Sequence, residues 1–175
     1  MLTELDPFAW LPQFMKLMIK PGAFLTTINL ANRPNVMAIG WANVGFIWGK
    51  PIFMAMVRPT RHSYACLEEV RQFGVCLPPP ALAAAIARAG SRSGREVDKF
   101  ADAKLEKLPA RRIKPPMVQG CLLHYECAVV YYNDLVPENL QQGLRESCYP
   151  KDDFHRLYFG EILTCYGDTE DLIKF

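Results

Sequence analysis

Two short polar stretches carry the residues that could do chemistry. The first is "RPTRHSY", residues 58–64, in which Arg58 and Arg61 alternate with the hydroxyls of Thr60 and Ser63. An apolar run precedes it and an apolar helical pattern follows, so these donors lie where a predicted strand gives way to a predicted helix. A helix N-terminus offers free N–H groups and a positive dipole end. The stretch therefore suits an anion, above all a phosphate.

The second stretch is "SRSGREVDKF", residues 91–100, which places Ser93, Gly94, Arg95 and Lys99 around another predicted helix start. Each stretch also has a plain structural interpretation, with the hydroxyls as helix caps and the arginines in solvent. Two donor-rich helix starts in one small domain favour a phosphorylated ligand more than either stretch alone does.

An aromatic ring attached to that phosphate would need flat apolar walls and backbone amides. The segment "VMAIGWAN", residues 36–43, supplies both. Its small residues Ala38 and Gly40 would let a ring approach the backbone. For Met37 and Trp41 the alternative is an ordinary place in the hydrophobic core.

The elements that must position these residues are mostly strands. Strands are predicted over 21–30, 36–44, 51–57, 72–78, 121–136 and 156–168, and short helices over 63–70, 79–90 and 96–105. The first three strands follow one another through tight turns, which indicates antiparallel pairing. About six such strands usually close on themselves to remove their edges. We therefore predict a mainly β fold, a small β-barrel with short helices.

The length of 175 residues suits a single domain over 1–175, with an apolar lead-in over 1–20 and a polar surface excursion over 137–155. The lead-in either packs on its own barrel or provides a dimer interface. A net charge of +2 is too small to attract nucleic acid by electrostatics alone, so we expect no nucleic-acid partner. No apolar run is long enough to span a membrane, so we expect no membrane partner. The six cysteines and three histidines lack metal-ligand spacing. Without a signal-peptide pattern, we expect reduced thiols and a cytoplasmic protein.

Several motifs, in this order, resemble the flavin reductase-like family, the FMN-binding split barrels that include the flavoredoxins. They are "NVMAIGW" at 35–41, "RPTRHSY" at 58–64, "SGREVDKF" at 93–100, and the later "LHYECAVV" and "YFGEIL". The similarity extends over roughly residues 20–165. It implies an FMN-binding split barrel that holds FMN without a covalent bond, commonly at a homodimer interface.

The resemblance also implies roles for individual residues. Arg58, Thr60 and Ser63 would meet the phosphate with Arg61 close by, and the second polar stretch would close the site. Ala38, Trp41 and Asn43 would lie along the flavin ring. The full set expected at the cofactor is Asn35, Met37, Ala38, Trp41, Asn43, Arg58, Thr60, Arg61, Ser63, Ser93, Gly94, Arg95 and Lys99.

Some positions depart from the family pattern. Ala38 and Gly40 stand where relatives often have hydroxyl residues, so backbone amides would have to serve the ring. Trp48 is bulky and is expected to narrow the mouth of the cavity.

The activity implied is that of an oxidoreductase. NADH or NADPH would give a hydride to FMN, which would pass electrons to a free flavin, a ferric complex or a partner protein. Because the flavin carries the chemistry, no side-chain acid or nucleophile is required. No Gly-x-Gly-x-x-Gly motif is present, so a nicotinamide would bind on the flavin itself. Two alternatives are a flavoredoxin-type electron-transfer protein without a nicotinamide site, and a binding module that has lost its flavin.

Overall fold

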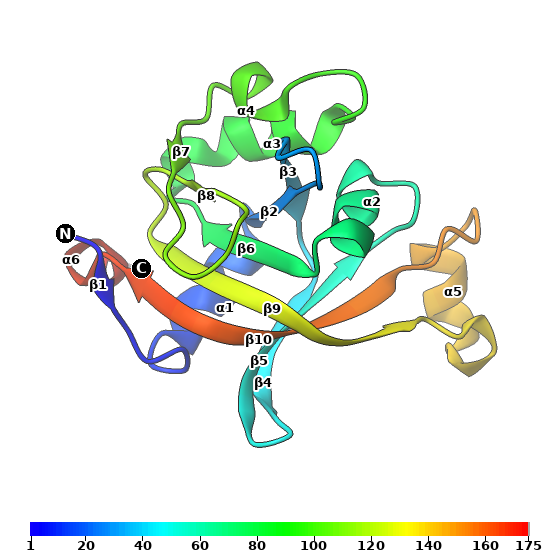
Figure 1. Cartoon of the computed structure of the whole chain (residues 1–175). Helices are drawn as coiled ribbons and strands as arrows, with labels where there is room; N and C mark the ends of the chain where they lie inside the picture. Colours follow the sequence, from blue (N-terminus) through cyan, green and yellow to red (C-terminus); the bar gives the residue numbers. More distant parts are fainter. Residues whose placement is uncertain (175) are drawn as a thin grey trace.

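The computed structural model of the protein describes residues 1–174. Eight of its strands form an antiparallel sheet in the order β3-β2-β6-β9-β10-β5-β4, with β1 added beside β10 (Figure 1), and β7 and β8 pair in a separate two-stranded sheet. The strands are β1 (Thr3–Glu4), β2 (Ala23–Ile28), β3 (Pro34–Ile39), β4 (Ala42–Ile47), β5 (Lys50–Val57), β6 (Gln72–Leu77), β7 (Lys107–Leu108), β8 (Met117–Val118), β9 (Leu123–Asp134) and β10 (Arg156–Gly167). The helices are α1 (Leu11–Ile19), α2 (His62–Glu69), η1 (Pro80–Leu82), α3 (Ala83–Ser91), α4 (Lys99–Asp102), η2 (Pro137–Asn139), α5 (Gln142–Cys148) and α6 (Thr169–Leu172).

The mainly β architecture is as predicted, but the sheet is not closed. Strands β3 and β4 stand at opposite ends of the strand order, although only Gly40 and Trp41 separate them in the chain. No ladder joins β3 to β4 within residues 1–174. The single strand expected over 36–44 is therefore wrong: the chain leaves one edge of the sheet at Gly40 and begins the opposite edge at Ala42. We call the place where the sheet stays open, between edge strands β3 and β4, the split.

The hairpin of β9 and β10 ties the two parts of the sheet together. Residues 123–128 of β9 pair with β6, whereas residues 156–161 of β10 pair with β5. The ladder between β9 and β10 is irregular near Gly160 and again between Ile162 and Thr164. Bulges of this kind bend and twist a strand. Beyond the place where β10 pairs with β5, the β4–β5 hairpin projects from the body of the molecule (Figure 1).

Aromatic rings fill the space that the curled sheet encloses. Phe14 of α1 contacts Phe53 and Tyr125 edge to face, with ring centroids 5.7 and 6.0 Å apart. Phe73 lies 6.2 Å from Phe53. Leu17 and Met18 of α1 are buried in the same cluster. Of the two alternatives for the apolar lead-in, the structure shows packing on its own sheet.

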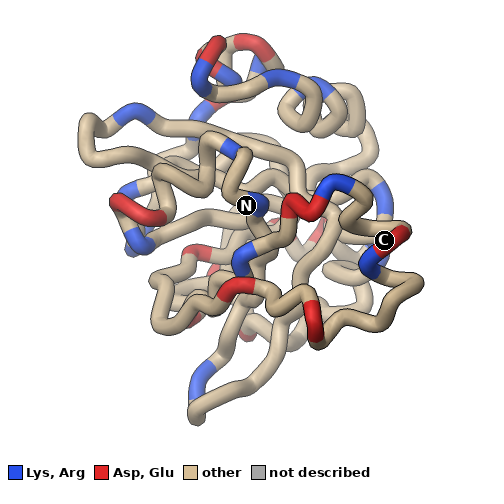
Figure 2. Tube along the Cα trace, turned by 90° about the vertical axis from the view of Figure 1, so that its right-hand side faces the viewer, with Lys and Arg blue, Asp and Glu red and all other residues tan. Residues whose placement is uncertain are grey.

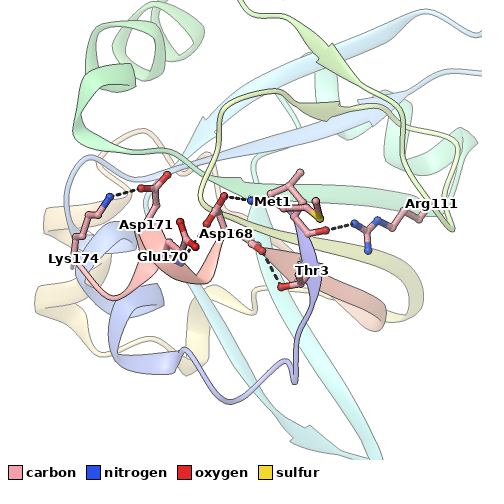
Figure 3. A network of polar contacts seen from close by, with 9 residues as sticks. Met1, Thr3, Arg111, Asp168, Glu170, Asp171 and Lys174 are labelled. Atoms are coloured by element: carbon pink, nitrogen blue, oxygen red, sulfur yellow. Dashed lines mark hydrogen bonds and ion pairs between the residues drawn. The ribbon is translucent and has the colours of Figure 1, made fainter.

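The two ends of the chain lie side by side (Figure 3). Strand β1 pairs with the end of β10, and the amine of Met1 lies 2.6 Å from the carboxylate of Asp168. Arg111 donates to the carbonyl of Leu2 at 3.2 Å. Acidic and basic residues are interspersed over the face drawn in Figure 2, in line with a net charge of +2.

The helix expected over 96–105 is much shorter. Helix α4 covers only Lys99–Asp102, because the side chain of Asp98 caps its start by accepting from the N–H groups of Phe100 and Ala101. Lys104 has a positive φ of 54°, which no helix can continue.

The cysteines are free thiols, as expected. Residues 1–174 contain no cluster of three metal-ligating side chains, and none of their helices is long and apolar enough to cross a membrane.

Candidate functional site

A cavity of about 460 Å³ opens at the split between β3 and β4. Its walls come from β3, the Gly40–Trp41 link, the end of β5, the start of α2, the end of α3 and the loop into α4. The lining residues are Asn35, Met37, Ala38, Ile39, Gly40, Trp41, Met56, Arg58, Thr60, Arg61, His62, Ser63, Ala89, Gly90, Ser91, Arg92, Ser93, Gly94, Glu96, Lys99 and His155. Both polar stretches of the sequence therefore meet at one cavity.

Two of the expected site residues do not line the cavity. Asn43 lies in β4, paired with Met54 of β5. Arg95 turns away and donates from Nη1 to the carbonyl oxygen of Thr60 at 2.8 Å. Arg95 thus joins the second polar stretch to the first instead of facing the cavity.

The first polar stretch is a turn that ends β5 and starts α2. The N–H of Arg61 donates to the carbonyl of Arg58 at 3.0 Å, with Pro59 at the turn position that favours proline. Arg61 is the N-cap, and no side chain caps the helix. Thr60 is therefore not the helix cap, which was the structural alternative for this residue.

Ser63 lies inside the first turn of α2 and is held from β3. The amide of Asn35 donates to its hydroxyl at 2.8 Å, and both side chains are buried. This bond fixes the start of α2 against β3, so the hydroxyl of Ser63 has a defined orientation at the cavity wall.

Gly94 allows the loop over 92–98 to close against these residues. A Cβ at this position would collide with the side-chain oxygen of Asn35 and would lie 2.7 Å from Cδ2 of His62. Only glycine lets the loop backbone come so near. The glycine of the second polar stretch is thus a packing requirement of the cavity.

Lys99 is the most unusual charge at the site. Its side chain lines the cavity, its residue is only 6% exposed, and its ammonium has no hydrogen bond or ion pair within residues 1–174. Burial, and to a lesser extent the nearby Arg61, lower the pKa of Lys99 to about 8. The neighbouring carboxylate of Asp102 opposes this shift but is bound to Arg88 at 2.7 Å. A buried cation without a partner favours the binding of an anion.

The excursion over 137–155 is not only a surface feature. Its exposed helix α5 lies beside the outer end of β9 and β10 (Figure 1), but Tyr149 is buried. The rings of Tyr149 and His155 lie 6.3 and 5.3 Å from the ring of Trp41. Burial and the nearby Arg58 lower the pKa of His155 to about 4, so this imidazole is neutral near pH 7. Of these rings, those of Trp41 and His155 line the mouth of the cavity, and the ring of Tyr149 packs against both.

Trp48 lies elsewhere, at the turn of the β4–β5 hairpin. Its ring contacts those of Tyr131 and Phe159 with centroids 5.6 and 6.0 Å apart, and it does not line the cavity. The expectation that Trp48 narrows the mouth is therefore wrong, because the hairpin carries it away from the split.

Several lining residues were missed in the sequence. His62 lies within the first polar stretch and Arg92 within the second, so both could have been included from their positions alone. Met56 faces the cavity from the end of β5, as the alternation of a strand allows. His155 has no comparable pattern, since it reaches Trp41 only through the packing of the excursion.

Comparisons with known proteins agree with this architecture. The model of the family described as "Flavin reductase like domain" matches residues 15–174. An uncharacterized protein from Archaeoglobus fulgidus is 26% identical over 138 residues, which cover 78% of this chain and 68% of that protein.

Solved structures share the fold. Flavoredoxin of Desulfovibrio vulgaris (Miyazaki F) aligns with a TM-score of 0.67 at 22% identity, over 85% of this chain and 69% of its own. The FMN-binding domain of a flavin reductase-like enzyme from Shewanella baltica aligns with a TM-score of 0.69 at 17% identity, over 97% and 78% of the two chains. Because this family model matches residues 15–174, nearly the whole chain, the chain belongs to the flavin reductase-like domain family.

Proposed function

We propose that the protein is an FMN-dependent oxidoreductase whose cofactor binds in the cavity at the split. The observation that carries this proposal is the unpaired ammonium of Lys99, a largely buried residue that shares the cavity with Arg58 and Arg61. A phosphate would supply the negative charge that Lys99 and Arg61 lack. The cavity volume of about 460 Å³ is within the range of sites for small molecules and cofactors.

The donors at the cavity fit the phosphate end of a flavin nucleotide. Lys99 and Arg61 offer charged donors, and Ser63 and Ser93 offer hydroxyls. The start of α2 adds a positive helix end that no side chain caps. A phosphate bound here would need no compensating cation from solvent.

The other walls fit the isoalloxazine ring. Met37, Ala38, Trp41 and Met56 give the cavity apolar surface, and the small side chain of Ala38 leaves backbone within reach of a ring. These positions have no side-chain hydroxyl, so backbone amides of the Ala38–Trp41 segment would bond the ring edge.

When bound, FMN supplies hydride and single-electron transfer. The residues of the chain bind and orient the cofactor, and the rings at the mouth keep water from it. The cations at the cavity also favour the more negative, reduced ring. The donor in this proposal is NADH or NADPH, and the acceptor is a free flavin, a ferric complex or a redox partner protein.

One observation favours the second candidate, a flavoredoxin-type electron-transfer protein. Trp41 and His155, with Tyr149 packed against both, narrow the mouth of the cavity, where a nicotinamide would have to stack on the flavin. A narrow mouth is compatible with electron transfer to a protein, which requires no stacking.

A homodimer is part of the proposal. Exposed apolar side chains gather on the β4–β5 hairpin and the adjacent outer end of β9, where Trp48 is 59% and Tyr131 44% exposed. Exposed aromatic clusters commonly mark interfaces. Light scattering on the purified protein should therefore give twice the chain mass, and Trp48→Glu should lower it to that of one chain.

The proposal is tested by anaerobic reduction. The purified protein is loaded with FMN and mixed with NADH or with NADPH while the visible absorption is followed. Rapid bleaching by either nucleotide supports the reductase and identifies its donor. Bleaching by dithionite alone supports the electron-transfer protein, and failure to take up FMN contradicts both.

A further inference from the structure

A carboxylate from the excursion lies against the two donors of the first polar stretch. The hydroxyl of Thr60 donates to Oδ2 of Asp153 at 2.8 Å, and the same oxygen lies 3.9 Å from Nη1 of Arg58. Asp153 itself does not line the cavity. Asp153 therefore lies outside the cavity and contacts two residues, Arg58 and Thr60, that line it.

This contact changes what Thr60 can offer a ligand. A hydroxyl has one proton, and Thr60 gives it to Asp153. Toward the cavity its oxygen can then only accept, which suits an O–H or N–H donor. A phosphate oxygen at the same place would find no donor from Thr60.

The same segment also engages Arg58. Its Nη2 donates to the carbonyl of Cys148 at 3.0 Å, and its guanidinium lies over the ring of Tyr149 at 5.2 Å from the centroid. With Asp153 close by, part of the positive charge of Arg58 is balanced within the protein. A bound phosphate would therefore be attracted to Arg58 less strongly than to an arginine without a carboxylate nearby.

The surroundings of Lys99 are different. The ammonium of Lys99 has no such carboxylate, because the nearest one, Asp102, is bound to Arg88. Among the described lining residues the one carboxylate is Glu96, which is exposed. The cavity thus has one pair of donors with a carboxylate partner, Arg58 and Thr60 (the Arg58–Thr60 end), and one pair of cations without such a partner among the described residues, Lys99 and Arg61 (the Lys99–Arg61 end).

We propose that Asp153 is a specificity-determining residue that directs the phosphate of the ligand to the Lys99–Arg61 end of the cavity. The Arg58–Thr60 end then takes a neutral, hydroxyl-bearing part of the ligand, such as a sugar or ribityl chain. This inference rests on the proposed binding of a flavin nucleotide.

The test compares FMN with riboflavin, which lacks the phosphate. Dissociation constants of both are measured by flavin fluorescence for the wild type, Asp153→Asn and Asp152→Asn. Asp153→Asn keeps an acceptor for Thr60 but removes the charge, so it should raise the preference for FMN over riboflavin at least about threefold. An unchanged or reduced preference overturns the inference, since a merely structural role would alter both affinities alike.

Asp152→Asn is the matched control. Asp152 carries the same charge one position earlier, but it pairs with Arg145 at 3.2 Å and its positive φ of 52° suits asparagine. Its substitution should leave the preference unchanged. An equal rise in both variants would show a general charge effect and would overturn the specific role of Asp153.

A second variant tests the other end of the contact. Thr60→Val is isosteric but cannot bond a ligand hydroxyl, so it should weaken FMN and riboflavin by a similar factor of about two- to tenfold. Weakening of FMN alone would place the phosphate at Thr60 and overturn the inference. A wild type that binds neither flavin would refute the proposed function itself, whereas binding with the wrong preferences refutes only this assignment.

Discussion

The hydroxyl of Tyr149 and Nδ1 of His155 lie 2.8 Å apart, and this hydrogen bond joins two residues of the excursion at the mouth of the cavity. Tyr149 is buried, and the ring of His155 packs on Trp41. The excursion contains the exposed helix α5, and this pair of residues packs its later part against the Gly40–Trp41 link between β3 and β4. Burial, together with the nearby Arg58 and Arg61, lowers the pKa of His155 and favours its neutral form there.

The stability of the protein should therefore depend on His155 in acid. Its pKa falls from an ordinary 6.5 in the unfolded chain to about 4 in the fold, so the unfolded state binds more protons between these values. Stability should rise with pH across this window, by at most about 3 kcal/mol from this residue.

Urea unfolding of wild type and His155→Gln at pH 4, 5, 6 and 7 measures this contribution. The slope of stability against pH should be smaller in the variant. His62 and His124 remain in both proteins, so the difference isolates His155. Parallel curves would show that His155 does not titrate as the structure indicates.

Lys99 should link flavin binding to pH in the alkaline range. Without ligand its pKa is about 8, and a phosphate beside the ammonium would raise it. Binding then takes up a proton above pH 8, so the affinity for FMN should fall as the pH rises from 8 to 10. Riboflavin titrated over the same range should show much less change, and an equal loss for both flavins would argue against Lys99 as the phosphate partner.

The same lysine should oppose stability while it supports binding. Between pH 8 and its ordinary pKa of 10.5 the unfolded chain holds the extra proton, so the free protein should become more stable with rising pH. Lys99→Met replaces a buried unpaired charge with an apolar side chain of similar length. We expect the thermal midpoint of the free protein to rise and the affinity for FMN to fall by about tenfold or more. Lys114→Met changes an exposed lysine outside the cavity and should affect neither; a fall in both quantities for Lys99→Met would contradict the account.

Gly94 should be required for the closed form of the loop. In Gly94→Ala the new Cβ would strike Asn35 and His62, so the 92–98 segment must move outward. The affinity for FMN and the thermal midpoint should both decrease, with a loss of stability of about 1–3 kcal/mol. Gly143→Ala is the control, because a Cβ in this exposed helix meets nothing within 4 Å. Equal behaviour of the two alanine variants would remove the close approach at Gly94 from the explanation.

Much of the site could be predicted from sequence because its residues lie in two continuous stretches. Arg58, Thr60 and Ser63 follow a strand and begin a helix, and local turn chemistry alone brings them together. Ser93, Gly94 and Lys99 form a second local group. That both groups face one cavity depends on the sheet, and the resemblance to a known family supplied this.

The features that sequence patterns could not predict depend on tertiary packing. Residues 36–44 have the alternation of a single strand, yet the chain changes sheet edge at Gly40 and Trp41, a step that local propensity does not encode. The position of Trp48 also depends on tertiary structure, because only the direction of the β4–β5 hairpin places this residue away from the cavity. The contacts of Asp153 and His155 with the site arise from a polar excursion whose composition predicts only exposure.

The most direct test of the account is an equilibrium titration of the wild-type protein with FMN and, separately, with riboflavin, followed by quenching of flavin fluorescence. If the cations of the cavity, Lys99 above all, bind the phosphate of a flavin nucleotide, FMN must bind more tightly than riboflavin. We expect one FMN per chain, bound at least about tenfold more tightly than riboflavin. Equal affinities for the two flavins, or no saturable binding of FMN, would contradict this expectation.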